Sequence, residues 1–302
     1  MRRLLLPAMI AGLCVCRGAS AQVVPARDLL EFPLATLDRG AALPGGIGDG
    51  FGNPATIALD HGERFRIGLA ALQTPSDQSV DLRMVAGAVS HGDRDTFGFS
   101  VLHVTVDNIY RTTTDPQTVG SIPYNTTLTS LAAAHRFGDH IIAGLAARYR
   151  TGEIDGDRRG TALLDFGATA TNLPFADARL GIASFLWRPV NPSRERPALN
   201  VGGDLRLYAS AIGGVPFDVR GGYGVTLTEG AQREDVIFGT ARIDGVQANA
   251  GIVRTTAFGT SEWRSRFGIG VRFDQYSAGV AREQNGAGLD PIYQFTLSTT
   301  IR

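Results

Sequence analysis

The sequence contains no lysine, and its only two cysteines, Cys14 and Cys16, lie near the N-terminus. After residue 16, a disulfide framework and a cysteine-ligated metal are therefore excluded. Basic and acidic residues balance at 29 each, and no block of positive charge indicates a nucleic-acid partner. The charge pattern describes a neutral chain for which we expect no nucleic-acid partner.

Long hydrophobic runs are also missing beyond the N-terminus, where no apolar stretch approaches the roughly 20 residues of a membrane helix. This absence excludes a helical inner-membrane protein. It does not exclude a transmembrane β-barrel, because the strands of a barrel show only alternate residues to lipid. No linker and no change of composition divides the chain after its first 60 residues.

The N-terminus has the layout of a secretory signal peptide. A basic start, Met1–Arg3, precedes the short apolar run Leu4–Val15, and Ala19–Ala21 forms an A-x-A cleavage site before Gln22. The two cysteines offer a lipoprotein signal as an alternative, but neither follows the small residue that lipid modification needs. We predict a signal peptide over 1–21, a separate segment over 22–60 and a barrel over 61–302.

The last forty residues alternate between two faces with a period of two. In 263–273 the odd positions are mostly aromatic or aliphatic, and the even positions are Arg, Gly and Asp through residue 274. The same alternation returns in 276–281 and 293–302. Such amphipathic strands, with aromatics near strand ends, are typical of a barrel that closes on itself in a membrane.

Short alternating runs between turn signals predict about fourteen strands, an even number, as single-chain bacterial barrels require. We expect the strands at these positions: 63–73, 80–91, 95–107, 125–137, 140–150, 160–172, 177–189, 199–209, 216–228, 234–243, 245–255, 262–273, 275–283 and 292–302. The predicted fold is an all-β, antiparallel transmembrane barrel with a short Gly-rich hatch or plug.

The predicted connections alternate loosely between short and long. Residues 138–139 and 244–245 carry two-residue hairpin signals. Longer polar loops are expected at 107–124, 152–159, 189–197 and 283–291. Short periplasmic turns and longer external loops favour an outer-membrane barrel. A soluble β-sandwich or barrel, which also alternates, is the alternative fold.

Charged residues recur on the second face, where Gly, Ala, Ser and Thr accompany them. Charge on the lipid face would cost roughly 2–4 kcal/mol at mid-membrane, so we assign these residues to the lumen. On one interpretation they pair with one another, and on the other they set a field that selects solutes. The predicted lumen-lining residues are Arg148, Arg150, Asp204, Arg206, Asp218, Arg220, Arg264, Arg266, Arg272 and Asp274.

Residues 22–60 are the least regular part of the chain, with six glycines between Gly40 and Gly52. These glycines argue against a long helix or strand. A short helix from Pro54 to about Asp60 is expected, with Asn53 as N-cap and Pro54 at the first helical position.

A secreted chain with a Gly-rich start, an Asn-Pro-Ala sequence and about fourteen strands resembles the FadL-like transporter superfamily. More closely, it resembles the PorV/PorQ-type branch, because 144–149 (Gly-Leu-Ala-Ala-Arg-Tyr), the Asp-Phe-Gly of 165–167 and the Leu-Gly-Ile-Ala of 180–183 are similar to its mid-chain pattern. In the transporters the N-terminal segment plugs the barrel as a hatch. The resemblance implies these hatch residues here: Gly46, Gly48, Asn53, Pro54 and Ala55.

Other chemical motifs are incomplete. Residues 50–55 match G-x-G-x-x-A without the βαβ unit that a dinucleotide site needs. Residues 155–157 (Asp-Gly-Asp) lack the remaining ligands of a calcium loop. The five histidines have no metal-ligand spacing, and no Gly-x-Ser-x-Gly elbow occurs. We therefore expect no cofactor, no metal and no enzymatic activity.

The sequence predicts a protein of the bacterial outer membrane, surrounded by its lipid, that passes hydrophobic or small solutes. The first alternative is a non-transporting barrel that acts as a docking or assembly component of a secretion system, as the PorV resemblance implies. The second is a soluble secreted β-protein that binds a ligand.

Overall fold

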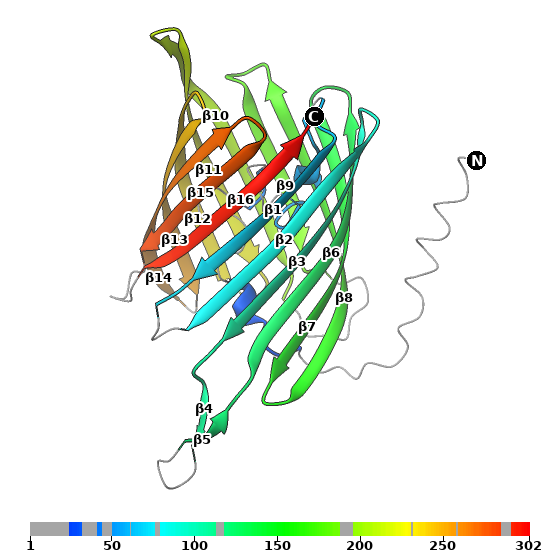
Figure 1. Ribbon diagram of the computed structural model, residues 1–302, viewed down its shortest axis with the longest axis vertical. Coiled ribbons are helices and arrows are strands. Elements are labelled where there is room, and N and C mark those ends of the chain that lie inside the picture. The colour runs from blue at the N-terminus through cyan, green and yellow to red at the C-terminus, as the bar shows by residue number, and fades with distance from the viewer. Residues whose placement is uncertain are drawn as a thin grey trace, which may run out of the picture.

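A computed structural model describes residues 24–31, 41–43, 50–60, 62–75, 79–112, 118–187, 196–230, 232–257, 259–284 and 291–302. The predicted signal peptide lies outside the described residues. Fourteen strands form a closed antiparallel barrel in which neighbours in sequence pair with one another and β1 pairs with β16 (Figure 1). Two further strands, β4 and β5, form a separate two-stranded sheet.

The described elements include two short 3-10 helices that precede the barrel, η1 (Asp28–Glu31) and η2 (Pro54–Ile57). The strands are β1 (Phe65–Gln73), β2 (Val80–His91), β3 (Asp95–Val106), β4 (Tyr110–Thr112), β5 (Thr118–Ser121), β6 (Tyr124–Phe137), β7 (Ile141–Ile154), β8 (Asp157–Leu173), β9 (Ala178–Phe185), β10 (Ala198–Ile212), β11 (Val215–Thr228), β12 (Gln232–Ile243), β13 (Val246–Ala257), β14 (Thr260–Phe273), β15 (Tyr276–Gln284) and β16 (Ile292–Ile301). The predicted barrel and its strand number are confirmed.

Two of the predicted connections differ in kind from those observed, and the strand predicted at 177–189 ends at Phe185. The loop expected at 152–159 is wrong, because β7 runs to Ile154, β8 begins at Asp157, and only Asp155 and Gly156 lie between them. Both of these residues have positive φ, 52° and 81°, which is the backbone of a tight hairpin turn. The predicted loop 107–124 contains the β4–β5 hairpin, which the sequence analysis missed.

The barrel wall has an apolar outer face. Trp263, Phe267 and Ile269 of β14 are each 58% exposed, while Arg266 between them is 4% exposed. Large apolar side chains point outward in the same way on every barrel strand, a face that suits lipid rather than water. Among the described helices, none is long and apolar enough to cross a membrane.

The two ends of the barrel differ in the length of their connections. We call one the turn end, where the connections 92–94, 138–140, 174–177, 213–214, 244–245 and 274–275 are all short. The opposite, loop end carries the longer connections 107–123, 186–197 and 285–291 and the projecting β4–β5 hairpin (Figure 1). In bacterial outer-membrane barrels the short turns face the periplasm and the longer loops face the outside of the cell.

The hydrogen-bonded ladder is incomplete at one position. β9 pairs with β8 only between Gly167 and Leu173, so the part of β8 from Asp157 to Phe166 has no ladder partner on that side among the described residues. Individual contacts close the wall here. The Leu164 amide donates to the Trp187 carbonyl (2.9 Å), and the Phe166 and Trp187 rings pack edge to face with centroids 5.6 Å apart.

Candidate functional site

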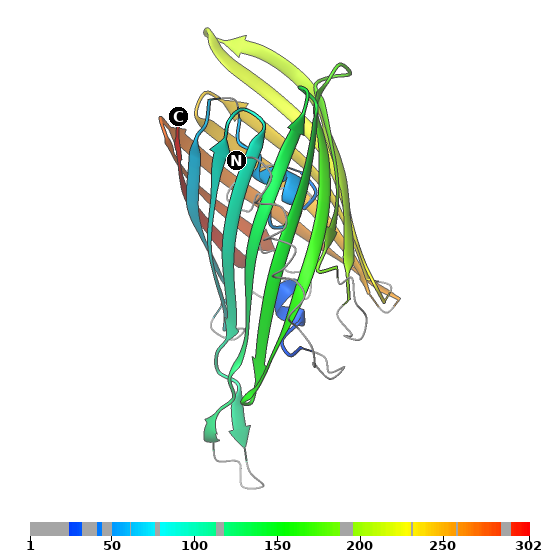
Figure 2. The same cartoon turned by 90° about the vertical axis from the view of Figure 1, so that its right-hand side faces the viewer.

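The described parts of residues 24–60 lie inside the barrel, and we call them the N-terminal segment (Figure 2). η1 lies toward the loop end, where the Tyr124 hydroxyl donates to the Asp28 carboxylate. η2 lies against the inner surfaces of β6, β7 and β8, and all four of its residues are buried. The segment thus runs through the lumen from the loop end toward the turn end, where β1 begins.

Asn53 anchors η2 to the wall. As the N-cap, its side-chain oxygen accepts from the Ala55 amide at 3.0 Å. Its Nδ2 donates to the carbonyls of Ala42, within the segment (2.8 Å), and Ala168, on β8 (3.2 Å). The helix predicted from Pro54 is confirmed, but it is a single 3-10 turn that ends at Ile57.

Glycines on the inner wall allow the segment to approach closely. A Cβ atom at Gly144 would collide with the backbone of Pro54 and Ala55, and one at Gly167 would collide with the Asn53 side chain. Both glycines belong to the mid-chain pattern that carried the family resemblance. In this chain the pattern therefore marks the inner surface on which η2 rests.

Arg148 on β7 connects the segment to the wall. Its Nε lies 2.6 Å from Oδ2 of Asp165 on β8, and both side chains are fully buried. Its Nη2 donates to the carbonyls of Gly50 (3.1 Å) and Phe51 (2.6 Å). The guanidinium lies over the rings of Phe51 and Phe185, 5.4 and 5.2 Å from their centroids. Arg148 therefore binds one wall carboxylate and one turn of the segment.

Arg150 lies one inward position nearer the loop end and is also fully buried. Its Nη1 donates to the Pro25 carbonyl (2.9 Å), and its Nη2 donates to the Val24 carbonyl (3.0 Å). Two of the predicted lumen arginines thus hold the N-terminal segment through its backbone.

Apolar side chains line the lumen at the loop end, around η1. They are buried on inward positions of the wall and on the segment, and we call them the apolar cluster: Ala26, Leu29, Leu30, Phe51, Ala70, Leu72, Val80, Leu82, Met84, Leu102, Val104, Leu128, Leu163, Leu186 and Ile292. Sequence reasoning missed this cluster because it treated the second face as polar throughout. The signal was present, since the inward positions of β2 (Val80, Leu82 and Met84) and of β3 (Leu102 and Val104) near the loop end are apolar.

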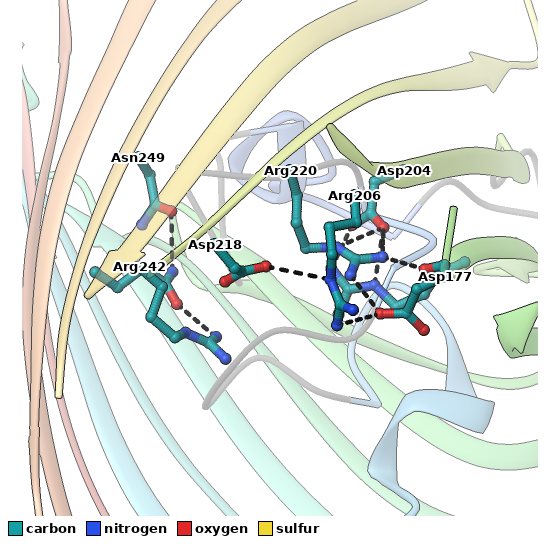
Figure 3. Close-up of polar contacts among 9 residues, drawn as sticks. Asp177, Asp204, Arg206, Asp218, Arg220, Arg242 and Asn249 are labelled. Atoms are coloured by element: carbon teal, nitrogen blue, oxygen red, sulfur yellow. Dashed lines mark hydrogen bonds and ion pairs between the residues drawn. The ribbon is translucent and has the colours of Figure 1, made fainter. Parts of the chain in front are cut away.

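The charged residues on the other side of the lumen form two networks. The turn-end network, shown in Figure 3 with its neighbours Arg242 and Asn249, comprises Asp177, Arg179, Asp204, Arg206, Asp218 and Arg220. Arg220 contacts Asp204 at 2.8 Å and Asp177 at 2.9 Å, and Arg206 contacts Asp177 at 2.7 Å. Three arginines and three aspartates leave the network electrically neutral.

The loop-end network comprises Glu234, Arg264, Arg266 and Glu283. Arg264 contacts Glu283 at 2.6 Å and Glu234 at 3.0 Å, while Arg266 contacts both carboxylates from the other side. The Glu283 side chain is fully buried. Buried charges require such partners, and every charged side chain of the two networks contacts one of opposite sign.

The remaining predicted residues lie elsewhere. Arg272 is half exposed at the turn end, 3.7 Å from Glu63. Asp274 lies in the turn between β14 and β15 with a φ of 53°, so it does not line the wall. Gly46 and Gly48 lie outside the described residues. In the part of the chain that is described, no group of three His, Cys, Asp or Glu side chains could hold a metal ion.

The closed antiparallel barrel and its apolar outer face are those of the class of outer-membrane β-barrels. No family model and no curated protein matches the chain. Among solved structures, the CymD monoaromatic hydrocarbon channel is similar over 93% of this chain and 97% of its own, at 11% identity and a TM-score of 0.54. A Pseudomonas aeruginosa FadL homologue is similar over 87% and 95%, at 12% identity and a TM-score of 0.50. The chain also spans 60% of the length of CdiB from Acinetobacter baumannii, at a TM-score of 0.45. At these identities the likeness to CymD and to the FadL homologue shows a shared fold.

Proposed function

We propose that this protein is a channel, and not an enzyme, that passes small hydrophobic solutes across the bacterial outer membrane. The observation that carries the proposal is the apolar cluster. Leu82, Leu102 and Leu128 point into the lumen from three different strands and are 0% exposed. A water-filled pore has a polar inner wall, so an apolar lining at the external end suits a hydrophobic solute.

The fold neighbours give the proposal further support, since CymD is a channel for monoaromatic hydrocarbons. The N-terminal segment adds a requirement. Leu29 and Leu30 occupy the middle of the apolar cluster, so a solute that enters from outside must displace or pass η1. Arg150 and Tyr124, which hold the segment there, are then the contacts that resist the displacement.

Uptake by living cells tests this function. The full chain is expressed in a Gram-negative host without hydrophobic channels of its own, and the rates of influx of a hydrophobic aromatic dye and of a small sugar are compared. We expect faster influx of the dye and unchanged influx of the sugar. Leu102→Asn and Leu128→Asn, which place amides in the apolar cluster, should slow the dye severalfold.

Thr240→Val is the matched control, because Thr240 is buried on β12, away from the apolar cluster. It should leave dye influx unchanged. Equal acceleration of the dye and the sugar would indicate an ordinary aqueous pore. No acceleration of the dye by a folded, surface-located barrel would end the proposal.

A docking role remains the second candidate, as the PorV resemblance implies. The observation that favours it is the β4–β5 hairpin, which projects beyond the barrel at the loop end (Figures 1 and 2). Replacing residues 107–123 by a short turn separates the two roles. A channel keeps its dye influx after this replacement, whereas a docking protein loses the secretion of its cargo.

A further inference from the structure

Among the buried polar atoms that have no hydrogen-bond partner in the described part of the chain are Oγ of Ser130 and Nη1 of Arg148, both inside the barrel. Ser130 is 3% exposed, and the Arg148 side chain is fully buried. The two residues are register partners on β6 and β7. Both point into the lumen, so their Cβ atoms lie roughly 5 Å apart. Because buried polar groups are nearly always paired, these two atoms call for a hydrogen-bond partner that the described residues do not supply.

The surroundings of this pair are apolar on two sides. Leu163 is the register partner of Arg148 on β8, and Leu128 lies two residues from Ser130 on β6. Both leucines belong to the apolar cluster. The Ser130 hydroxyl and Nη1 of Arg148 thus lie at the edge of the apolar cluster.

We propose that Ser130 and Arg148 form a subsite for the oxygen of a neutral hydrophobic solute, such as an alcohol, a ketone or an ester, whose hydrocarbon part packs on the apolar cluster. The inference rests on the proposed function and names the class of solute. The oxygen accepts one hydrogen bond from the Ser130 hydroxyl and one from Nη1 of Arg148.

The charges around the subsite favour a neutral oxygen of the solute over a carboxylate. Asp165 already neutralises Arg148 at 2.6 Å, and the Nη2 group of Arg148 is engaged by the Gly50 and Phe51 carbonyls. Arg150, the other buried guanidinium nearby, directs both Nη atoms at carbonyls of the segment. A carboxylate bound at Ser130 would share Arg148 with a buried aspartate, an arrangement that desolvation opposes. A neutral acceptor takes the same two donors and adds no charge.

Binding of three eight-carbon probes, octane, 2-octanone and octanoate, tests the subsite. Binding of each probe to the full chain in lipid nanodiscs is measured by calorimetry, with empty nanodiscs as the blank. We expect 2-octanone to bind more tightly than octane or octanoate. Ser130→Ala should weaken 2-octanone about fivefold, the worth of one net hydrogen bond, and leave octane unchanged.

Two further variants keep the test decisive. Ser130→Thr retains the hydroxyl and should restore most of the affinity for 2-octanone, while Thr240→Val should change none of the three affinities. Heat-modifiable gel mobility checks that each barrel is folded. If Ser130→Ala leaves the ratio of 2-octanone to octane affinity unchanged, the subsite is wrong while the channel stands. If octanoate binds most tightly, the preference for neutral solutes is wrong, and if no probe binds, the proposed channel fails as well.

Discussion

Removal of the Asp165 carboxylate should destabilise this barrel more than any change to a surface charge. Asp165 lies 2.6 Å from Nε of Arg148, and its other oxygen accepts from the Trp187 amide at 2.9 Å. Both members of the ion pair are fully buried. Asp165→Ala therefore leaves a guanidinium without its charged partner in the wall, a change that costs about 3–5 kcal/mol of unfolding free energy.

The ion pair at the barrel surface provides the matched control. Arg83 contacts Asp81 at 3.0 Å, but the Arg83 side chain is 77% exposed. Exposed pairs of this kind contribute little to stability, so Asp81→Ala should leave the unfolding free energy nearly unchanged. Both substitutions delete the aspartate of an Asp–Arg ion pair. A difference between their unfolding free energies therefore reports the effect of burial and not of the lost charge alone.

A double-mutant cycle isolates the pair itself. Arg148→Met combined with Asp165→Leu removes both charges, so it should cost at least about 2 kcal/mol less than the sum of the single variants. Urea unfolding of the barrel in lipid vesicles, under conditions where unfolding is reversible, measures the four proteins of the cycle together with Asp165→Ala and Asp81→Ala. A loss below about 1 kcal/mol for Asp165→Ala, or additive single effects, would refute the reasoning.

Three further predictions follow from the contacts inside the lumen. Gly144→Ala pushes a Cβ atom into the η2 backbone and should destabilise the barrel by about 1–3 kcal/mol in urea unfolding, whereas Gly239→Ala, whose nearest atom would be 3.7 Å away, should cost little. Asn53→Ala removes the N-cap of η2 and should cost about 1–2 kcal/mol, and limited proteolysis should show faster cleavage within the N-terminal segment. Arg220→Ala leaves Asp204 with one arginine in place of two, so the thermal transition of the barrel should fall by several degrees on heated gels. An unchanged transition would show that the turn-end network is not required for stability.

The barrel could be predicted from the sequence because its wall is a single sheet. Successive residues of each strand face the lipid and the lumen in turn, and this alternation is visible in the sequence. Each position in β14 has lipid on one side or the lumen on the other, so the alternation from Trp263 to Phe273 survives unaltered in the structure. Strand boundaries were predicted less accurately where the same residues can form either a loop or a tight turn. Asp155-Gly156 can start a loop or close a tight turn, and only the pairing of Ile154 with Asp157 decides.

The contents of the lumen were harder to predict, because sequence does not show which inward residues meet. The arginines were expected to line an interior surface, but their partners Asp165, Glu234 and Glu283 come from other strands. The apolar cluster depends on η1 reaching the loop end, a placement that no local pattern in 22–60 contains. Asn53 was predicted from the sequence as an N-cap, and the structure confirms that role, but its hydrogen bonds to the Ala42 and Ala168 carbonyls could not be predicted.

The central claim, that the N-terminal segment fills the lumen of a channel, is tested most directly by ion conductance in planar bilayers. The full chain should insert with no steady open conductance. A variant without residues 24–59 should give stable open steps, because the carbonyls, leucines and η2 that occupy the lumen are gone. Equal conductance of the two inserted barrels would contradict the account.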